Sequence, residues 1–254
     1  MTLLIDIGNS RIKWARAGDD RPRDIRAVAY RDETENAIAT VANDVANDEA
    51  VAFGASVGSV DVRDALSAAL RERGVDVRWL TVTREALGVT CGYRDTERLG
   101  VDRWMASLAG FHRAPAAALI AQIGTAATID AVTASGRHLG GMILPGLELM
   151  AEALYGETAR IRAGAEDLPD PNTRLEYFAD DTDTAVQNGC LLAVTAAIEE
   201  SYHALRDAGS DVTVFLAGGA SAAIAQQLTI AHEHEPSLVL DGIRRVALEE
   251  LIDA

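Results

Sequence analysis

A chain of 254 residues, 48% of them hydrophobic, is long enough to fill two domain cores or a single large one. Its net charge of −16 opposes binding to nucleic acid and to anionic membranes, so we expect neither as a partner. No apolar run approaches the roughly 18 residues of a membrane span, and Asp6 interrupts the N-terminal apolar stretch before a signal-peptide core forms.

The chain begins with strands around a polar turn. Residues 2–7 and 11–17 are apolar, β-prone runs, so Gly8-Asn9-Ser10 between them is predicted to be a hairpin tip, where Gly and Asn tolerate positive φ. A turn at 18–20 leads to a third run at 24–30. The first segment is therefore predicted to be strand, turn, strand, turn and strand.

Lys13, just after this tip, is the only lysine in the chain, and the other 22 of its 23 basic residues are arginines. A row of backbone N–H groups at a turn binds anions, and a compact ammonium beside it favours phosphate. Asp6, near the end of the first strand, is suited to hold the hydrated magnesium of a nucleotide. An ordinary hairpin with a surface lysine is the alternative, because short glycine patterns have many false positives.

Between these strands and the C-terminal region, strands and helices alternate, as in an α/β protein. Strands are predicted at 50–54 and 77–82. The predicted helices are 34–45, 61–73, 101–112, 147–159 and 182–208.

The middle of the chain carries a polar segment from Gly92 to Trp104. Leu99-Gly100 interrupts the chain before a helix and places Asp102 and Arg103 in its first turn. A carboxylate there suits the helix dipole, and an arginine reaches sideways for an anion. A capping aspartate with a solvated arginine is the alternative.

The second half repeats the order of the first. An apolar strand at 117–123 is followed by a turn at 124–128, and further runs at 129–133 and 138–144 complete the copy. Two copies half a chain apart predict a duplicated domain with a cleft between the copies. The predicted domains are residues 1–112 and 113–254.

A third glycine turn, Ala217 to Ser221, follows a strand predicted at 211–216 and opens a helix at 222–228. Gly218 and Gly219 would permit close backbone approach to adenine or ribose, although such a pair is also common in tight turns. The loop 163–173, with two prolines, is a candidate border of the cleft.

Taken together, these motifs resemble the type III pantothenate kinases, in the superfamily of acetate and sugar kinases, heat-shock chaperones and actin. The resemblance runs from Asp6 to about Gly242, in the family's order. It implies two ribonuclease-H-like α/β domains with an active-site cleft, usually in a homodimer. Its motifs are Asp6-x-Gly8-Asn9-Ser10-x-x-Lys13, Gly100-Val101-Asp102-Arg103, Gly124-Thr125-Ala126-x-Thr128-x-Asp130, Gly140-Gly141-x-x-x-Pro145-Gly146 and Gly218-Gly219.

The resemblance implies transfer of the γ-phosphoryl group of ATP to the primary hydroxyl of pantothenate, giving 4′-phosphopantothenate in the first step of coenzyme A biosynthesis. Mg²⁺ would accompany ATP, held through water by Asp6, and Asp102 would be the catalytic base. The implied ATP and phosphate positions are Asp6, Ile7, Gly8, Asn9, Ser10, Arg11, Ile12, Lys13, Gly124, Thr125, Gly218 and Gly219. The implied pantothenate positions are Tyr93, Gly100, Val101, Asp102, Arg103 and Thr182.

One position departs from the family's pattern. Where the family has an aspartate that ligates a monovalent cation, K⁺ or NH₄⁺, this chain has Gln122. A neutral amide oxygen lacks the charge that makes such a site tight, so we expect potassium dependence to be weakened or lost.

Two other functions stay open at this point. One is another kinase or phosphohydrolase of the superfamily, acting on a sugar, a small acid or polyphosphate. The other is a non-catalytic accessory protein that keeps the fold, which Gln122 makes conceivable and the presence of Asp6, Lys13 and Asp102 disfavours.

Smaller features carry less weight. His232-Glu233-His234-Glu235 is read as an exposed polar turn rather than a metal site, because further ligands are lacking. Asp130 is either a second acidic group near the phosphates or a strand residue that faces solvent. Two isolated cysteines, Cys91 and Cys190, indicate free thiols in a reducing compartment, so we expect a cytoplasmic protein.

Overall fold

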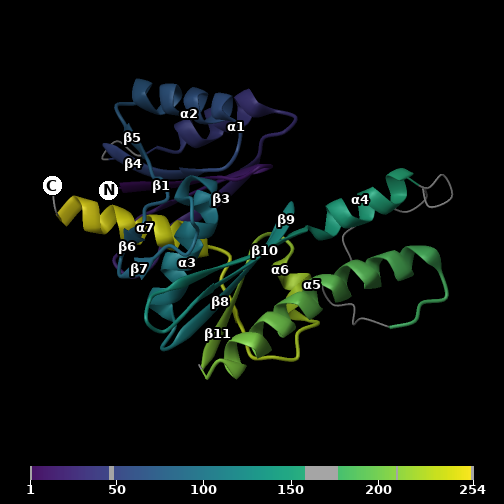
Figure 1. Cartoon of the computed structure of the whole chain (residues 1–254). Helices are drawn as coiled ribbons and strands as arrows, with labels where there is room; N and C mark the ends of the chain where they lie inside the picture. Colours follow the sequence, from purple (N-terminus) through teal and green to yellow (C-terminus); the bar gives the residue numbers. More distant parts are fainter. Residues whose placement is uncertain (1, 46–48, 158–176, 210, 253–254) are drawn as a thin grey trace. The chain divides into compact units, whose positions relative to one another are not determined.

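The computed structural model describes residues 2–45, 49–157, 177–209 and 211–252. The chain divides into two compact units, each built around a five-stranded sheet (Figure 1). Unit 1 comprises Met1–Ala109 and Ser237–Ala254, and unit 2 comprises Gly110–Pro236.

The sheet of unit 1 has the order β3-β2-β1-β4-β5. β1 pairs antiparallel with β2, which pairs antiparallel with β3, whereas β4 lies parallel to β1 and to β5. Its strands are β1 (Thr2–Ile7), β2 (Arg11–Arg16), β3 (Arg23–Ala29), β4 (Val51–Ser56) and β5 (Asp76–Trp79).

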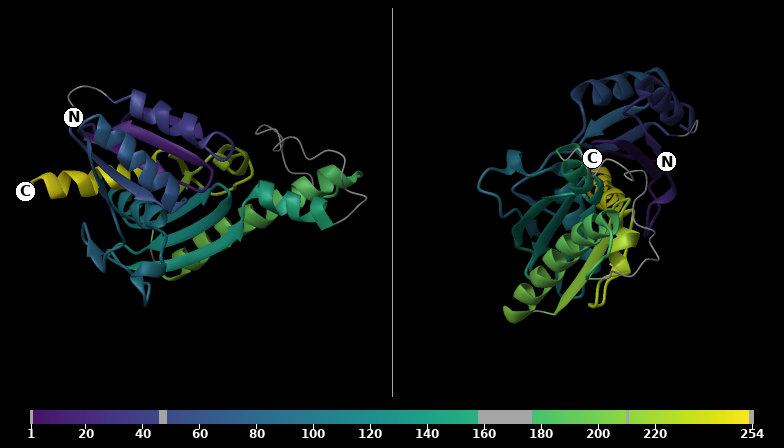
Figure 2. Two further views of the ribbon diagram at one scale, coloured as in Figure 1. Left: turned by 90° about the horizontal axis from the view of Figure 1, so that it is seen from above. Right: turned by 90° about the vertical axis from the view of Figure 1, so that its right-hand side faces the viewer.

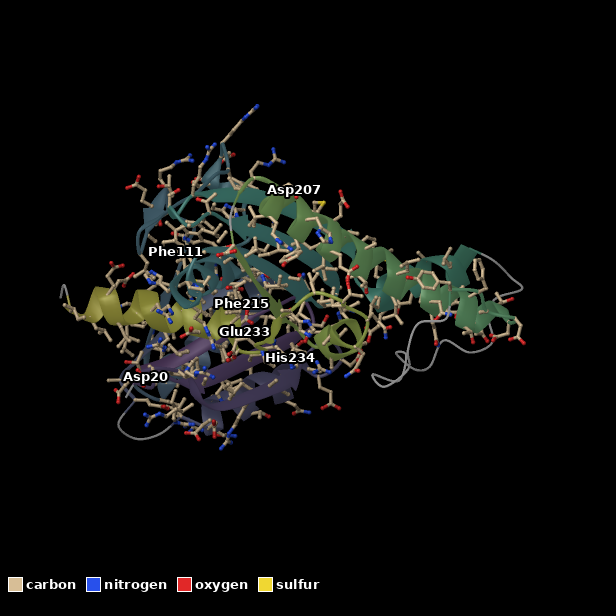
Figure 3. The ribbon with its side chains drawn as sticks, turned by 90° about the horizontal axis from the view of Figure 1, so that it is seen from below. Asp20, Phe111, Asp207, Phe215, Glu233 and His234 are labelled. Atoms are coloured by element: carbon tan, nitrogen blue, oxygen red, sulfur yellow. The ribbon has the colours of Figure 1, made fainter. Side chains whose placement is uncertain are left out.

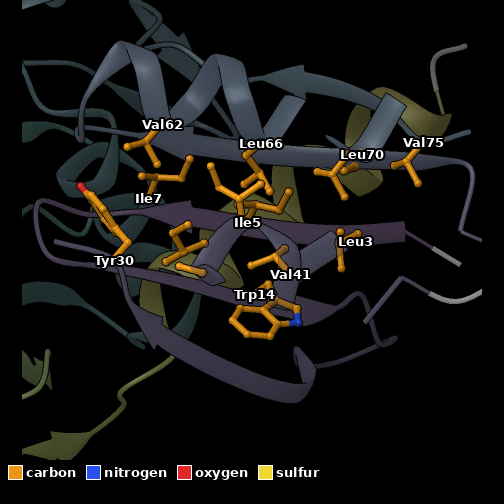
Figure 4. Close-up of a cluster of buried hydrophobic side chains, with 14 residues drawn as sticks. Leu3, Ile5, Ile7, Trp14, Tyr30, Val41, Val62, Leu66, Leu70 and Val75 are labelled. Atoms are coloured by element: carbon orange, nitrogen blue, oxygen red, sulfur yellow. The ribbon is translucent and has the colours of Figure 1, made fainter. Parts of the chain in front are cut away.

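The core of unit 1 lies under α1 (Thr34–Asn43) and α2 (Val60–Glu72). Alternate residues of a strand point to the same face, so the buried side chains of Leu3, Ile5 and Ile7 all reach this core. There they join the buried Leu66 and Leu70 of α2, which recur at helical spacing (Figure 4). The alternation of β1 and the periodicity of α2 thus produce one apolar layer.

Two further helices complete unit 1. α7 (Leu238–Ile252) contacts β1 and β4, and α3 (Val101–Arg113) begins in this unit. A Cβ atom added to Gly242 would collide with the carbonyl of Met105, so glycine lets α7 approach α3 closely. The smaller elements are the hairpin β6 (Glu85–Ala86) and β7 (Val89–Thr90) and the 3₁₀ helix η1 (Thr96–Arg98).

The sheet of unit 2 has the order β10-β9-β8-β11-β12, which repeats that of unit 1. The first three strands in the chain are again antiparallel neighbours, and the last two lie parallel to the first. The predicted duplication is confirmed by this shared topology. The strands are β8 (Ala117–Ile123), β9 (Ala126–Val132), β10 (His138–Pro145), β11 (Val212–Ala217) and β12 (Glu233–His234).

The helices of unit 2 are α4 (Leu147–Glu157), α5 (Thr182–Asp207) and α6 (Ser221–Ala225). Buried residues of α5, including Val194 and Ile198, share a core with the sheet residues Leu119 and Ile129. α4 and α5 contact each other, and they run side by side in both views of Figure 2. No helix in the described ranges is long and apolar enough to cross a membrane.

The units differ from the predicted ranges 1–112 and 113–254 chiefly at the C-terminus. α7 belongs to unit 1 because its buried face, which includes Leu240 and Ile243, packs on the first sheet. β9 begins at Ala126, three residues before the expected start, so the turn before it is shorter than expected. The loop expected at 163–173 lies outside the described residues.

Candidate active site

The first predicted phosphate-binding turn links β1 to β2. Ile7 pairs with Ile12, the N–H of Gly8 donates to the carbonyl of Arg11 at 3.0 Å, and Gly8-Asn9-Ser10 lies between the two strands. Neither Gly8 nor Asn9 has the positive φ expected of a tight hairpin tip. The chain reverses at Gly8-Asn9-Ser10 without a left-handed residue, so that part of the prediction is wrong.

This turn is held by residues that sequence analysis missed. The hydroxyl of Tyr30 donates to the carbonyl of Gly8 at 2.7 Å, and burial raises the pKa of that hydroxyl. A Cβ atom at Gly58 would lie 2.7 Å from that hydroxyl and 2.8 Å from the Gly8 carbonyl oxygen. These contacts join distant segments, so no local motif marks them.

Asp6 and Lys13 are direct cross-strand partners on β1 and β2. Asp6 is 7% exposed, and burial is the main reason that its pKa rises to about 7. The Lys13 ammonium lowers that pKa and the Asp102 carboxylate raises it further. The structure therefore brings all three predicted charged groups of unit 1 within electrostatic range of one another.

Asp102 lies in the first turn of α3, as predicted. Its Oδ1 accepts a hydrogen bond from the N–H of Arg103 at 2.8 Å, and Trp104 N–H donates to the carbonyl of Gly100 at 3.0 Å. A Cβ atom at Gly100 would lie only 2.6 Å from Asp102 Oδ1. Gly100 thus leaves the space that the Asp102 carboxylate occupies.

Arg103 is buried, with 4% exposure, so its charge needs polar partners. Its Nη1 donates to the hydroxyl of Tyr93 at 2.9 Å, and its Cζ lies 5.7 Å from the centre of the Tyr93 ring. The predicted pantothenate residues Tyr93 and 100–103 therefore form one contiguous group in unit 1.

The glycine turns of unit 2 also gather together. The carbonyl of Thr125 accepts from Gly146 N–H at 2.9 Å, and the carbonyl of Ile123 accepts from Ala220 N–H at 3.1 Å. The turns after β8, β10 and β11 thus meet at one end of the sheet. They contain four of the predicted ATP positions, Gly124, Thr125, Gly218 and Gly219.

The two glycines of the third turn serve different needs. Gly218 has φ of 94°, and a Cβ there would collide with the backbone of Ile123, so its close approach is to protein. A Cβ at Gly219 would meet nothing within 4 Å. Of the two, Gly219 is the one with open space beside it.

Gln122 on β8 pairs across the strands with Thr128 on β9. The Nε2 of Gln122 and the Oγ1 of Thr128 are both buried, and neither has a hydrogen-bond partner among the described residues. Gln122 is thus a neutral side chain, beside another neutral one, at the position where the resemblance implied a charged cation ligand.

Thr182, the remaining predicted pantothenate residue, is the first residue of α5 and belongs to unit 2. The carboxylate of Asp181 caps this helix by accepting from Thr184 N–H at 2.9 Å, and hydrogen bonding to Thr184 lowers the Asp181 pKa. The predicted place of Thr182 at the start of a helix is therefore confirmed.

Asp130 is 1% exposed and lies 3.1 Å from the Nε2 of His138, so the expectation that it faces solvent is wrong. Asp130 lies on β9, and its partner His138 is itself fully buried, at 0% exposure. Nothing in the sequence indicated that Asp130 pairs with a buried histidine.

The polar segment 232–235 is more ordered than a surface turn. Glu233 and His234 form β12, alongside Phe215 of β11 (Figure 3). His234 Nε2 lies 2.8 Å from Ser221 Oγ, and Glu235 forms a 2.6 Å ion pair with Arg113. Within the described ranges, no group of three or more His, Cys, Asp or Glu side chains is placed to hold a metal.

Solved structures share the fold. A conserved Baf family protein from Campylobacter jejuni superposes with a TM-score of 0.62 at 20% identity, covering 98% of this chain and 99% of that one. A ROK hexokinase from Thermus thermophilus gives 0.51 at 15% identity, covering 100% and 99%. These likenesses and the duplicated sheet define the class of fold, two ribonuclease-H-like α/β units of shared topology.

The sequence comparison narrows this class. The family model of the type III pantothenate kinases matches residues 2–204. The type III pantothenate kinase of Herminiimonas arsenicoxydans is 36% identical over 260 residues, with 99% of each chain covered. The chain belongs to the type III pantothenate kinase family.

Proposed function

We propose that this protein phosphorylates the primary hydroxyl of pantothenate with ATP, giving 4′-phosphopantothenate and ADP, and that it opens coenzyme A biosynthesis. The observation that carries the proposal is the group in unit 1 formed by Asp6, Lys13 and Asp102, with Arg103 and Tyr93 alongside. Family membership supports the choice of pantothenate over a sugar or polyphosphate.

Asp102 is the proposed base. Its carboxylate accepts the proton of the pantothenate hydroxyl while the oxygen bonds to the γ-phosphorus of ATP and the bond to the bridging oxygen of ADP breaks. The Gly100 position, which leaves room for this carboxylate, supports the assignment. Arg103, whose guanidinium is hydrogen-bonded to the Tyr93 hydroxyl, is suited to bind a polar group of pantothenate so that the primary hydroxyl lies in line with the γ-phosphorus.

Lys13 and the turn at Gly8-Asn9-Ser10 are the proposed contacts to the phosphates, with Asp6, Ile7, Arg11 and Ile12 completing that segment. The braced Gly8 carbonyl supports this role, because a rigid turn keeps its N–H groups oriented without cost at the moment of reaction. In unit 2, Thr125 and the open Gly219 position are proposed to contact ATP.

The residues of unit 1 fit a hydrated magnesium ion. Asp6 is a buried carboxylate with an elevated pKa and a second carboxylate nearby, so a divalent cation would compensate charge that the fold leaves costly. Mg²⁺ supplies charge neutralisation on the phosphates of ATP. Asp6 is the residue we propose to hold it, through water.

The residues at the family's monovalent-cation position do not fit a tight K⁺ or NH₄⁺ site. The side-chain nitrogen of Gln122 and the hydroxyl of Thr128 are buried, and neither side chain supplies negative charge. We therefore propose that activity depends little on K⁺. Equal rates in potassium and sodium buffers are expected, and a strong potassium requirement would contradict this.

A homodimer is proposed from the surface of unit 2. β10 is an edge strand of its sheet, and its side chains Met142 and Ile143 are exposed. Leu149 and Leu154 of α4 are exposed as well. An open sheet edge beside exposed apolar side chains favours association with a second copy. Light scattering should give twice the chain mass, and Ile143→Glu should lower it toward the monomer.

A cytoplasmic location is proposed on chemical grounds. Cys91 and Cys190 are both free and buried, which suits a reducing compartment. The proposed co-substrate, ATP, is also a cytoplasmic metabolite.

The test of the proposed function is ATP consumption stimulated by added pantothenate. The purified protein should release ADP with pantothenate and not with hexoses, acetate or polyphosphate, and mass spectrometry should find a single phosphate on the primary hydroxyl. ADP release that is indifferent to pantothenate would reject the proposal.

A further inference from the structure

We propose that Arg84 is a positioning residue for the pantothenate side of the active site, acting through the loop Cys91–Arg94. The inference deepens the proposed function and rests on it. Arg84 carries no motif and lies seven to ten residues before the carbonyl groups that it binds. Its contacts all belong to unit 1.

A short hairpin places Arg84 at the start of this loop. β6 and β7 are joined by Leu87 and Gly88, whose φ angles of 49° and 75° are those of a type I′ turn, the turn that best matches strand twist. At the open end, the N–H of Cys91 donates to the carbonyl of Arg84 at 2.8 Å. The buried Val89 and Cys91 fix the hairpin in the unit.

The Arg84 guanidinium donates hydrogen bonds to three backbone carbonyl groups. Nη1 donates to Cys91 O at 3.1 Å and to Tyr93 O at 2.7 Å, and Nη2 donates to Arg94 O at 3.1 Å. Carbonyl oxygens that converge on one point repel one another unless a cation lies between them. The planar fork of arginine satisfies several acceptors at once, which a lysine ammonium matches poorly.

The loop that Arg84 holds carries Tyr93. From it, the Tyr93 hydroxyl accepts the hydrogen bond of the buried Arg103, which directly follows Asp102. A shift of the loop would move Tyr93, break its hydrogen bond with Arg103 and disturb the proposed pantothenate site. Arg84 itself is exposed, so it acts through this loop and not through the core.

The same contacts predict which kinetic constant changes. The phosphate turn at Gly8 is held separately, by the Tyr30 hydroxyl and the backbone N–H groups of Val57 and Gly58. Loss of Arg84 leaves those hydrogen bonds in place. Pantothenate kinetics should therefore respond far more than ATP kinetics.

The experiment compares Arg84→Ala with Arg71→Ala, which removes the same charge from an exposed position in the last turn of α2. For Arg84→Ala we expect kcat/KM for pantothenate to fall at least about tenfold while KM for ATP stays within about twofold. Low millimolar guanidinium should restore part of the activity of Arg84→Ala and none to Arg71→Ala. Arg84→Lys, which keeps the charge, should fall between wild type and Arg84→Ala.

The outcomes separate the two proposals. If the wild type phosphorylates pantothenate and both arginine-to-alanine variants match it, the role of Arg84 is overturned and the proposed function stands. If Arg84→Ala weakens ATP and pantothenate kinetics equally, the role is again overturned. If Arg84→Ala fails to fold, Arg84→Lys decides by the same split between substrates. A wild type without pantothenate kinase activity overturns both proposals.

Discussion

The two units share one sheet topology and carry different chemistry at equivalent points. In unit 1, the penultimate residue of the first strand is Asp6, paired across the sheet with Lys13. In unit 2, the penultimate residue of the first strand is Gln122, paired with Thr128. On the other side, the parallel neighbour places an alanine at both points: Ala55 of β4 lies beside Asp6, and Ala217 of β11 lies beside Gln122. One unit thus keeps a charged pair where the other has two neutral side chains.

This difference shows which features two copies of a fold share and which features differ between them. The alternation of side chains and the sheet order are fixed by packing, so both units retain them. The polar residues near the strand ends contribute little to the apolar cores and are therefore open to divergence. Unit 1 concentrates charge, while unit 2 offers backbone N–H groups and glycine turns.

The largest expected effect comes from removing charge in unit 1. Asp102→Asn should lower kcat at least about a hundredfold, because the amide cannot accept the proton of the attacking hydroxyl. Steady-state ADP release with saturating pantothenate measures it. Asp61→Asn, the same change in the first turn of α2, is the matched control. Near-normal turnover by Asp102→Asn would remove Asp102 from its role.

The second test concerns the cost of the charge at Asp6. Its pKa is about 7 in the folded protein and 3.8 for the free side chain, so folding without ligand disfavours the ionised form. Protonated Asp6 therefore favours the folded state relative to the ionised form. This contribution to the free energy of unfolding is fully present below pH 3.8 and is lost as the pH rises to about 7. Without magnesium and nucleotide, Asp6→Asn should therefore be more stable than wild type at pH 8, by up to about 4 kcal/mol.

Urea unfolding at pH 8 and at pH 4.5 measures this difference. The advantage of Asp6→Asn should shrink at the lower pH, where less of the unfolded wild type is ionised. An asparagine variant that is less stable than wild type at both pH values would contradict the cause given for the pKa. The variant should also lose activity, since an amide holds magnesium poorly.

The third test gives unit 2 the charge of unit 1. In Gln122→Asp, a carboxylate faces Thr128, and the ratio of activity in potassium buffer to that in sodium buffer should rise at least about threefold. Its melting temperature should become potassium-dependent, while that of the wild type should not. Gln122→Glu is a control that adds the charge on a longer side chain. No change in the potassium response of Gln122→Asp would mean that charge is not what this position lacks.

The smallest effect is expected from removing the hydroxyl of Thr128. This hydroxyl is buried and has no hydrogen-bond partner in the described parts of the chain, so Thr128→Val should stabilise the protein by up to about 1 kcal/mol. Thermal unfolding detects it. A loss of stability would show that the hydroxyl is hydrogen-bonded in solution.

Much of the fold could be predicted from local pattern. The strand at 2–7, the helix from Val101 and the strand at 117–123 lie where expected, because their apolar periodicity matches the faces they bury. α7 was missed, although Leu240, Ile243 and Ala247 recur at helical spacing. The hairpin β6 and β7 was missed because strands of two residues leave no periodic pattern.

The candidate site was predicted unevenly for a related reason. Asp6, Lys13, Asp102, Gly124 and Gly218 lie in short motifs that a sequence shows directly. Tyr30, Gly58 and the His138 partner of Asp130 act through contacts that no motif records. The cleft expected between the domains stays a prediction, as do the roles of the individual site residues.

The sequence by itself determined the class of fold, the duplicated order of strands and which residues are proposed to carry the chemistry, because periodicity and short motifs depend only on neighbours along the chain. Tertiary structure alone decided the burial that raises the pKa of Asp6 and the membership of α7 in unit 1. It also decided which three carbonyl groups accept hydrogen bonds from Arg84. Desolvation and hydrogen bonding depend on which distant residues meet in space, and no local pattern encodes that.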